Sequence, residues 1–230
     1  MGLIDERGTG MRARPRWLAR TAGEVLRRGW EMMAQLATIR SGDPRARRFH
    51  AFGANSCVCF PSASILGYDR ISIGSDTMVG AYSTLSAGLP LQPPNPSWAG
   101  PTLTIGDRCV IGRGATITAH RTIVVEDDVW MGNDVFVSDQ NHDWVDADRP
   151  IGEQAQAPRP VRIGAGSWIG HGAMILPGAH VGRRSIIAAG AVVTEPVPDH
   201  SIVGGVPGRV ISTTAPDDVV VLPLQPGKPA

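Results

Sequence analysis

The chain has few aromatic residues, few cysteines and no long apolar run. Only 5% of its 230 residues are aromatic, and its three cysteines are odd in number, with Cys57 and Cys59 close together and Cys109 far away. This is a poor disulfide framework, so we expect buried structural thiols rather than a metal or redox centre. No apolar stretch approaches the roughly 20 residues that span a bilayer, and the N-terminus lacks the apolar core of a signal peptide. These absences favour a cytoplasmic protein.

Aliphatic residues and glycine, in contrast, are abundant and follow a period of six. The chain has 28 glycines and is 42% hydrophobic. From residue 163 onward an aliphatic side chain returns at every sixth position: Ile163, Ile169, Ile175, Val181, Ile187 and Val193. This period fits neither a helix nor an alternating strand. It indicates a parallel β-helix, in which each hexapeptide forms one flat face and three faces make a coil of about eighteen residues.

The same pattern recurs with interruptions from about Ile65 to Val203, which predicts an all-β solenoid. Two insertions break it. Residues 88–102 are rich in proline and suit a fixed extended loop. Residues 139–162 contain His142, Trp144 and several acids. Because the coils of a solenoid are scaffold and its excursions carry chemistry, we expect the active site at the second insertion.

The two ends of the chain differ from the solenoid. The formal net charge of +1 hides an asymmetry, since the first fifty residues hold eleven arginines and five acids. Residues 15–39 have the pattern of an amphipathic helix. We favour a cap on the first coil over a membrane-surface helix, and a nucleic-acid role is disfavoured because no stacking aromatics are interleaved. The predicted regions are 1–50 (helical), 51–211 (β-helix) and 212–230 (proline-rich tail).

The residues that follow the second insertion resemble a known family. They read VRIGAGSWIGHGAMILPGAHVGRRSIIAAGAVVTEPVPDHSIVGGVPGRVI and end in the most specific segment, GVPGRVI at 205–211. This block is similar to the C-terminal half of the left-handed β-helix, hexapeptide-repeat acyltransferases, which include maltose, galactoside and nodulation-factor O-acetyltransferases. The resemblance is close over 163–211 and holds by repeat pattern over 65–137.

The resemblance implies an acetyl-CoA-dependent O-acetyltransferase that needs no metal. The enzyme would transfer the acetyl group directly to a hydroxyl of a saccharide or glycosylated precursor, as in polysaccharide biosynthesis. The family implies a homotrimer with each active site in a groove between neighbouring prisms. If the N-terminal helix touches a membrane, the inner membrane face and a lipid-linked acceptor would fit. The acceptor, the modified hydroxyl and the acyl chain length do not follow from the sequence.

The resemblance also implies a general base. His142 is the candidate, because the family commonly places its catalytic histidine in an Asn-His pair such as Asn141-His142, and an imidazole pKa of about 6.5 suits the task. Asp139 or Asp143 could hold the other ring nitrogen, although a backbone carbonyl would serve equally. His120 is a weaker candidate for lining the groove.

Contacts to coenzyme A are carried over residue by residue. Trp168 would flank the pantetheine arm, or simply pack at a coil corner, and the amide of His171 would lie near the thioester carbonyl. Ala189 and Thr194 would meet the pantetheine amides with their backbone. Arg209 would meet a phosphate.

The chain departs from the family pattern at Glu195, where many relatives have lysine, and at Ser212, where some have arginine. Both changes remove positive charge near the nucleotide end, and the effect on coenzyme A affinity does not follow from the sequence. Affinity for coenzyme A would then depend on Arg209 together with Arg183 or Arg184.

Three alternatives stay open. A gamma-class carbonic anhydrase shares the prism but needs three histidines around zinc, two of them closely spaced along one coil, and His120, His142 and His171 lack this spacing. A non-catalytic scaffold would show neither coenzyme A binding nor an effect of changing His142. Within the enzyme class, the runner-up is N-acylation of an amino sugar or of an antibiotic-type acceptor.

Overall fold

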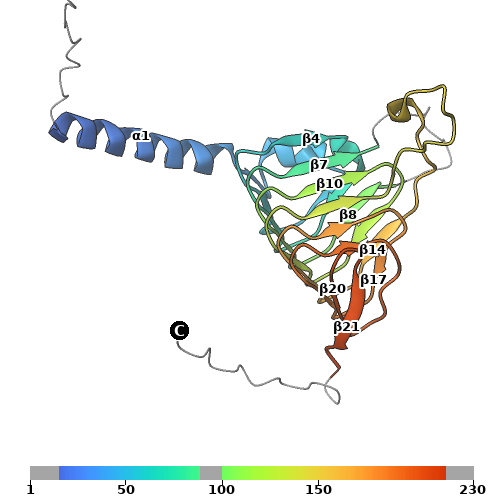
Figure 1. Ribbon diagram of the computed structural model, residues 1–230. Helices are drawn as coiled ribbons and strands as arrows, with labels where there is room; N and C mark the ends of the chain where they lie inside the picture. The colour runs from blue at the N-terminus through green and yellow to red at the C-terminus, as the bar shows by residue number, and fades with distance from the viewer. Residues whose placement is uncertain (1–15, 89–99, 216–230) are drawn as a thin grey trace, which may run out of the picture. The chain divides into compact units, whose positions relative to one another are not determined.

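The computed structural model describes residues 16–88 and 100–215, with side chains from residue 23 onward. The chain divides into two compact units, Met1–Ala37 and Thr38–Ala230 (Figure 1). The division follows Ala37, whereas the sequence prediction places it after residue 50, because residues 39–48 contribute a strand and a short helix to the second unit. Most of the proline-rich insertion and of the predicted tail, residues 89–99 and 216–230, lie outside the described residues.

The first unit contains helix α1 (Arg16–Ala37), where the sequence predicts a helix at 15–39. Its polar side is held by ion pairs: the Arg27 guanidinium lies 2.6 Å from both Glu24 and Glu31. Large apolar side chains of the helix are exposed: Val25, Leu26, Trp30, Met32, Met33 and Leu36. The two roles expected for this helix, solenoid cap or membrane contact, stay predictions. In the described part of the chain no helix is long and apolar enough to cross a bilayer.

The second unit is a parallel β-helix with three sheets, which we name faces A, B and C. Face A consists of β1 (Ile39–Arg40), β3 (Cys57–Val58), β6 (Met78–Val79), β9 (Val110–Ile111), β12 (Trp130–Met131), β15 (Trp168–Ile169), β18 (Ile186–Ile187), β20 (Ser201–Gly204) and β21 (Arg209–Thr213). Face B consists of β2 (Ala51–Phe52), β5 (Ile71–Ile73), β8 (Leu103–Ile105), β11 (Ile123–Val125), β14 (Val161–Ile163) and β17 (His180–Val181). Face C consists of β4 (Ser64–Leu66), β7 (Thr84–Ala87), β10 (Thr116–Ala119), β13 (Phe136–Ser138), β16 (Met174–Ile175) and β19 (Val192–Val193).

The chain runs through these faces in the order B, A, C and then back to B. Neighbouring coils pair in parallel, and among the described strands antiparallel pairing is confined to β1 with β3 and β20 with β21. Three short 3₁₀ helices interrupt the described coils: η1 (Pro44–Arg48), η2 (Tyr68–Arg70) and η3 (Ile151–Glu153). Each coil therefore has a B–A corner, an A–C corner and a C–B corner.

The bore is filled by the aliphatic residues of the six-residue period. Val125, for example, is in register with Ile105 on one side and Ile163 on the other, and all three are at most 1% exposed. The six aliphatic residues predicted at 163–193 are all buried, so the inward direction of the repeat is confirmed. Burial of each such side chain stabilises the fold by about 1.5–3 kcal/mol.

The cysteines divide into two kinds. Cys109 is fully buried at a B–A corner, where its thiol donates to the carbonyl of Glu126 at 3.1 Å. Burial raises the pKa of Cys109 to about 11, which suits the structural role expected for it. The expectation of buried thiols is wrong for Cys57 and Cys59, which are only half-buried. Both flank the inward-pointing Val58 of β3, so their side chains point out of face A.

Candidate active site

The second insertion forms an arm, residues 139–160, that leaves the prism after β13 and returns at β14 (olive in Figure 1). Its two sides are hydrogen-bonded along their length. The N–H of Arg159 donates to the carbonyl of Asp139 at 2.7 Å, and the N–H of Gln156 donates to that of Asn141 at 2.9 Å. His142 lies opposite Ala155 in an antiparallel bridge. The arm is therefore an ordered hairpin-like excursion at a C–B corner.

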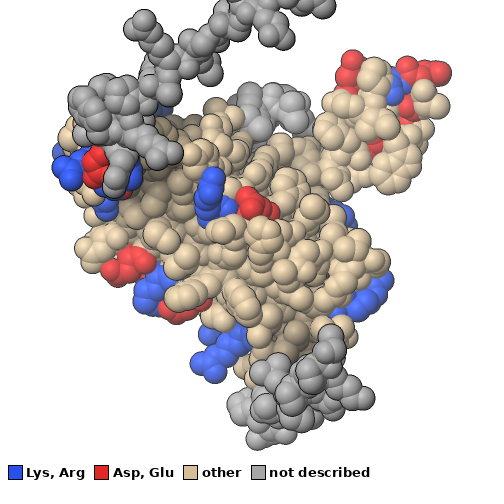
Figure 2. All heavy atoms as spheres, turned by 60° about the vertical axis from the view of Figure 1, so that its left-hand side comes forward, with Lys and Arg blue, Asp and Glu red and all other residues tan. Residues whose placement is uncertain are grey.

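The tip of the arm is folded around the side chain of Gln154, which is only 8% exposed. Its amide nitrogen donates to the carbonyls of Asp146 and Arg149 at 2.8 and 2.9 Å, and its oxygen accepts from the N–H of Asp146 at 3.0 Å. Acidic side chains gather on the outside of the tip (Figure 2). One buried amide thus organises a loop that carries mostly exposed acidic and apolar residues: Asp143, Trp144, Val145, Asp146, Asp148, Ile151 and Glu153.

The root of the arm is fixed by the fully buried carboxylate of Asp139. It accepts backbone N–H groups of the preceding coil: His120 at 2.7 Å, Arg121 at 2.7 Å and Thr122 at 2.8 Å. The imidazole Nδ1 of His120 lies 3.4 Å from the same carboxylate, longer than a good hydrogen bond. Burial acts to raise the pKa of Asp139, but these contacts prevail and hold that pKa below its ordinary value.

This geometry corrects the expectation that Asp139 orients His142. Both oxygens of Asp139 are occupied at the 120–122 turn, so the carboxylate holds the root of the arm instead. Asp143 uses its Oδ1 to accept the N–H of Trp144 at 2.8 Å. Asn141 and His142 are both exposed, and no hydrogen bond from the His142 ring occurs among the described residues. His142 is thus presented to solvent on an anchored arm.

The residues expected at the thioester lie on face A and at the A–C corner. Trp168 is 56% exposed and lies beside Trp130, its register partner on the preceding coil. His171 and Ala189 are exposed at successive A–C corners, and their backbone N–H groups have no acceptor among the described residues. The coils stack so closely here that a Cβ added at Gly170 would lie 2.5 Å from the nitrogen of Ala189.

The remaining cofactor candidates lie further along the solenoid. Thr194 is exposed at a C–B corner, and its backbone N–H likewise has no acceptor in the described chain. Arg209 is exposed at the start of β21, where its guanidinium donates to the carbonyl of Gly208 at 2.9 Å. The turn before it packs on face C, because the N–H of Gly208 donates to the carbonyl of Val192 at 2.7 Å.

One chain does not bring the candidate base and the candidate thioester contacts together. His142 belongs to a C–B corner, whereas His171 and Ala189 belong to A–C corners, so the width of face C lies between them. The base and the thioester contacts would therefore meet only if an A–C corner of one copy faced the arm of another.

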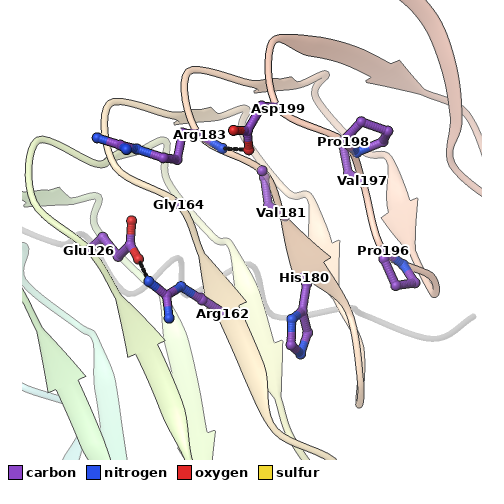
Figure 3. A pocket seen from close by; sticks show the side chains of 11 residues that line it. Glu126, Arg162, Gly164, His180, Val181, Arg183, Pro196, Val197, Pro198 and Asp199 are labelled. Carbon is purple, nitrogen blue, oxygen red and sulfur yellow. Dashed lines mark hydrogen bonds and ion pairs between the residues drawn. The ribbon is translucent and has the colours of Figure 1, made fainter.

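A hollow of about 320 Å³ lies elsewhere, on face B beside the B–A corner (Figure 3). Arg162 and His180 lie on its floor from adjacent strands, and Arg162 forms an ion pair with Glu126. On its far side the N–H of Arg183 donates to Asp199 at 2.7 Å. Of the residues predicted to act in catalysis or to bind coenzyme A, Arg183 lines this hollow, whereas His142 and Arg209 do not. The sequence signal for this hollow, polar residues at outward positions of the repeat, does not distinguish it from ordinary surface.

The described residues contain no group of three or more His, Cys, Asp or Glu side chains that could hold a metal. His120, His142 and His171 accordingly do not converge on one point. A zinc centre of the carbonic anhydrase kind has no ligand set in the described chain.

Comparison with known proteins identifies the repeat. The bacterial transferase hexapeptide (six repeats) model matches residues 160–195, and the hexapeptide repeat of succinyl-transferase model matches residues 102–138. Over these two segments the chain therefore carries the hexapeptide repeat of bacterial transferases. This repeat implies a left-handed β-helix, in agreement with the parallel faces described above.

Individual hexapeptide transferases resemble parts of the chain. A probable acetyltransferase of Mycobacterium tuberculosis is 36% identical over 48% of the chain and 37% of its own length. The galactoside O-acetyltransferase of Escherichia coli is 31% identical over 56% of the chain and 63% of its own length. The matched part of the chain thus spans about half the length of these curated relatives.

A solved structure shares the fold. AntD, an N-acyltransferase from Bacillus cereus crystallised with dTDP and coenzyme A, has a TM-score of 0.65 to the chain at 20% identity. The superposition covers 78% of this chain and 92% of AntD. At this identity the likeness concerns the fold alone.

Proposed function

We propose that the protein transfers an acetyl group from acetyl-CoA to a hydroxyl of a saccharide or glycosylated precursor, with His142 as general base. The observation that carries this proposal is the exposed His142 on an arm anchored at its root by Asp139, within a fold of the hexapeptide-repeat transferase family. Similarity to a galactoside O-acetyltransferase supports a sugar-like acceptor.

The chemistry assigns a task to each group. His142 would take the proton of the acceptor hydroxyl as its oxygen attacks the carbonyl carbon of the thioester. The carbon–sulfur bond then breaks, and the imidazolium returns the proton to the departing sulfur. The free N–H of His171 would stabilise the negative charge that develops on the carbonyl oxygen, because such donors act best where charge appears in the transition state.

The proposal includes a homotrimer. Since His142 and the A–C corner of one chain lie on opposite sides of face C, a working site needs the arm of a neighbouring copy. A ring of three copies in head-to-tail contact would form three such sites. Exposed apolar side chains along face A would then lie near these contacts: Met78 (42%), Trp130 (61%) and Trp168 (56%).

The test is acetyl-CoA turnover, followed by release of free thiol with a panel of sugars. We expect His142→Ala to lower acceptor-dependent release by about 10²-fold or more, the scale of lost general-base catalysis. His180→Ala is the matched control, because His180 is also an exposed histidine but lies on face B, away from the arm. Equal activity of wild type and His142→Ala would move the base elsewhere, and an absence of both release and coenzyme A binding would favour the scaffold reading.

N-acylation is the second candidate, because the fold is shared with an N-acyltransferase. Amino sugars are therefore included in the same panel. Faster release with an amino sugar than with its hydroxyl analogue would assign the amine as acceptor, without changing the role of His142.

A further inference from the structure

Two thiols and a thioether lie side by side on the outside of face A. Cys57 and Cys59 flank the buried Val58, so both point outward, and both are half-buried rather than enclosed. Met78 is the register partner of Cys57 on the next coil and is 42% exposed. Arg40 is the register partner of Cys57 on the opposite side, in β1. Three soft, sulfur-containing side chains thus occupy neighbouring positions of face A, next to the position of one cation.

The two thiols are hydrogen-bonded to each other. This bond lowers the pKa of Cys57 to about 6, burial opposes the shift, and the charge of Arg40 adds to it. The same bond raises the pKa of Cys59 above its ordinary value. The two thiols are therefore neighbours on the outside of face A.

The spacing of the pair disfavours a disulfide. Side chains two positions apart on one side of a strand leave it about 6.6 Å apart, twice the rise per residue. A disulfide needs its Cβ atoms within about 3.5–4.5 Å, so a direct sulfur–sulfur bond would require the strand to buckle. A single metal ion placed between the sulfurs adds two bonds of about 2.3 Å each and spans the gap without distortion.

We propose that Cys57 and Cys59 bind one soft monovalent metal ion of the copper(I) type, with Met78 as the thioether ligand. Thiolate and thioether ligands select copper(I), whereas structural zinc needs four ligands of a kind that the described residues do not assemble here. Both cysteines bind the ion as thiolates, so binding releases thiol protons to solvent. The resulting complex carries one negative charge, which the guanidinium of Arg40 balances.

The test is an anaerobic titration of the reduced full-length protein with copper(I), in competition with bicinchoninate as a coloured chelator. We expect one ion per chain, with release of protons on binding because the cysteines bind the ion as thiolates. Cys57→Ser and Cys59→Ser should each abolish binding. Met78→Leu should weaken it roughly tenfold, a change of about 1.4 kcal/mol.

Cys109→Ser is the matched control, because Cys109 is fully buried and lies outside the pair. Circular dichroism of each variant verifies that it is folded. No withdrawal of copper from the chelator, or equal loss of binding in Cys109→Ser, would overturn the proposal. So would uptake that occurs only with dimer formation in size-exclusion chromatography, because the ion would then bridge two chains.

Discussion

Replacement of Asp139 by asparagine tests how the arm is anchored. In the wild type the carboxylate accepts three N–H groups at 2.7–2.8 Å in a fully buried position. An asparagine oxygen at the Oδ2 position could still accept from Arg121 and Thr122, but its NH₂ group would then face the N–H of His120. The variant therefore loses the charge of the acceptor and leaves one buried donor unpaired.

The expected fall in the free energy of unfolding follows from these two losses. A hydrogen bond to a charged group contributes about 1.5–3 kcal/mol, and an unsatisfied buried donor costs about 1–3 kcal/mol. We therefore expect Asp139→Asn to lower the free energy of unfolding by about 3–5 kcal/mol. For a chain of this size each kcal/mol shifts Tm by about 2–4 °C, so thermal unfolding followed by circular dichroism should show a fall of about 6–20 °C.

The stabilisation by Asp139 depends on pH with a definite sign. Because the folded pKa of Asp139 is lowered, the stabilisation is complete above the unfolded value of about 3.9 and is lost as the pH falls through the folded pKa. The difference between wild type and Asp139→Asn should thus be constant from pH 7 to 5 and shrink only below about pH 4. Asp148→Asn, at an exposed position on the arm, should stay within about 0.5 kcal/mol. A fall of under about 2 °C for Asp139→Asn at pH 7, or a difference that persists undiminished at the lowest pH, would refute the reasoning.

Two further predictions concern the ends of the solenoid. Arg209→Ala removes positive charge near the expected phosphates and should raise KM for acetyl-CoA about tenfold or more, with kcat little changed. Glu195→Lys restores positive charge there and should lower KM. Both values come from steady-state kinetics, and an unchanged KM in both variants would place the nucleotide elsewhere. If α1 contacts membrane, deletion of residues 1–40 should abolish flotation with anionic liposomes, whereas retained flotation would remove the membrane role and leave the solenoid cap.

The repeat was predictable because burial recurs at a fixed interval. Each hexapeptide places one aliphatic side chain in the bore, so Ile163 and its successors reveal the fold by spacing alone. The role of Asp139 could not be read this way, since its partners belong to the preceding coil. A signal was nevertheless present: Asp139 lies 17 to 19 positions after its three donors, close to the length of one coil. Asp127 repeats the arrangement 20 positions after its donor, the N–H of Asp107.

The site was less predictable than the fold for a different reason. The Asn-His pair and the small residues at 188–191 are visible in the sequence, but the sequence does not show at which corner each will lie. The order of faces B, A and C supplies this, and it separates His142 from His171 by the width of face C. Similarly, the exposure of Cys57 and Cys59 depends on the direction of Val58, which an isolated three-residue segment does not determine.

The separation of His142 from His171 within one chain leads to a complementation experiment. One variant, His142→Ala, lacks the proposed base, and a second, Trp168→Ala with Arg209→Ala, is damaged on the proposed coenzyme A side. If each site joins the arm of one copy to the A–C corner of the next, every trimer that contains both variants has about one intact site in three, because a head-to-tail ring joins each chain to a different neighbour. Co-expressed chains with two different tags, purified through both, should therefore recover about a third of wild-type turnover, although each variant alone is impaired. If the site were contained within one chain, no mixed trimer would have an intact site, and the doubly purified protein would be no more active than a mixture of the separate variants.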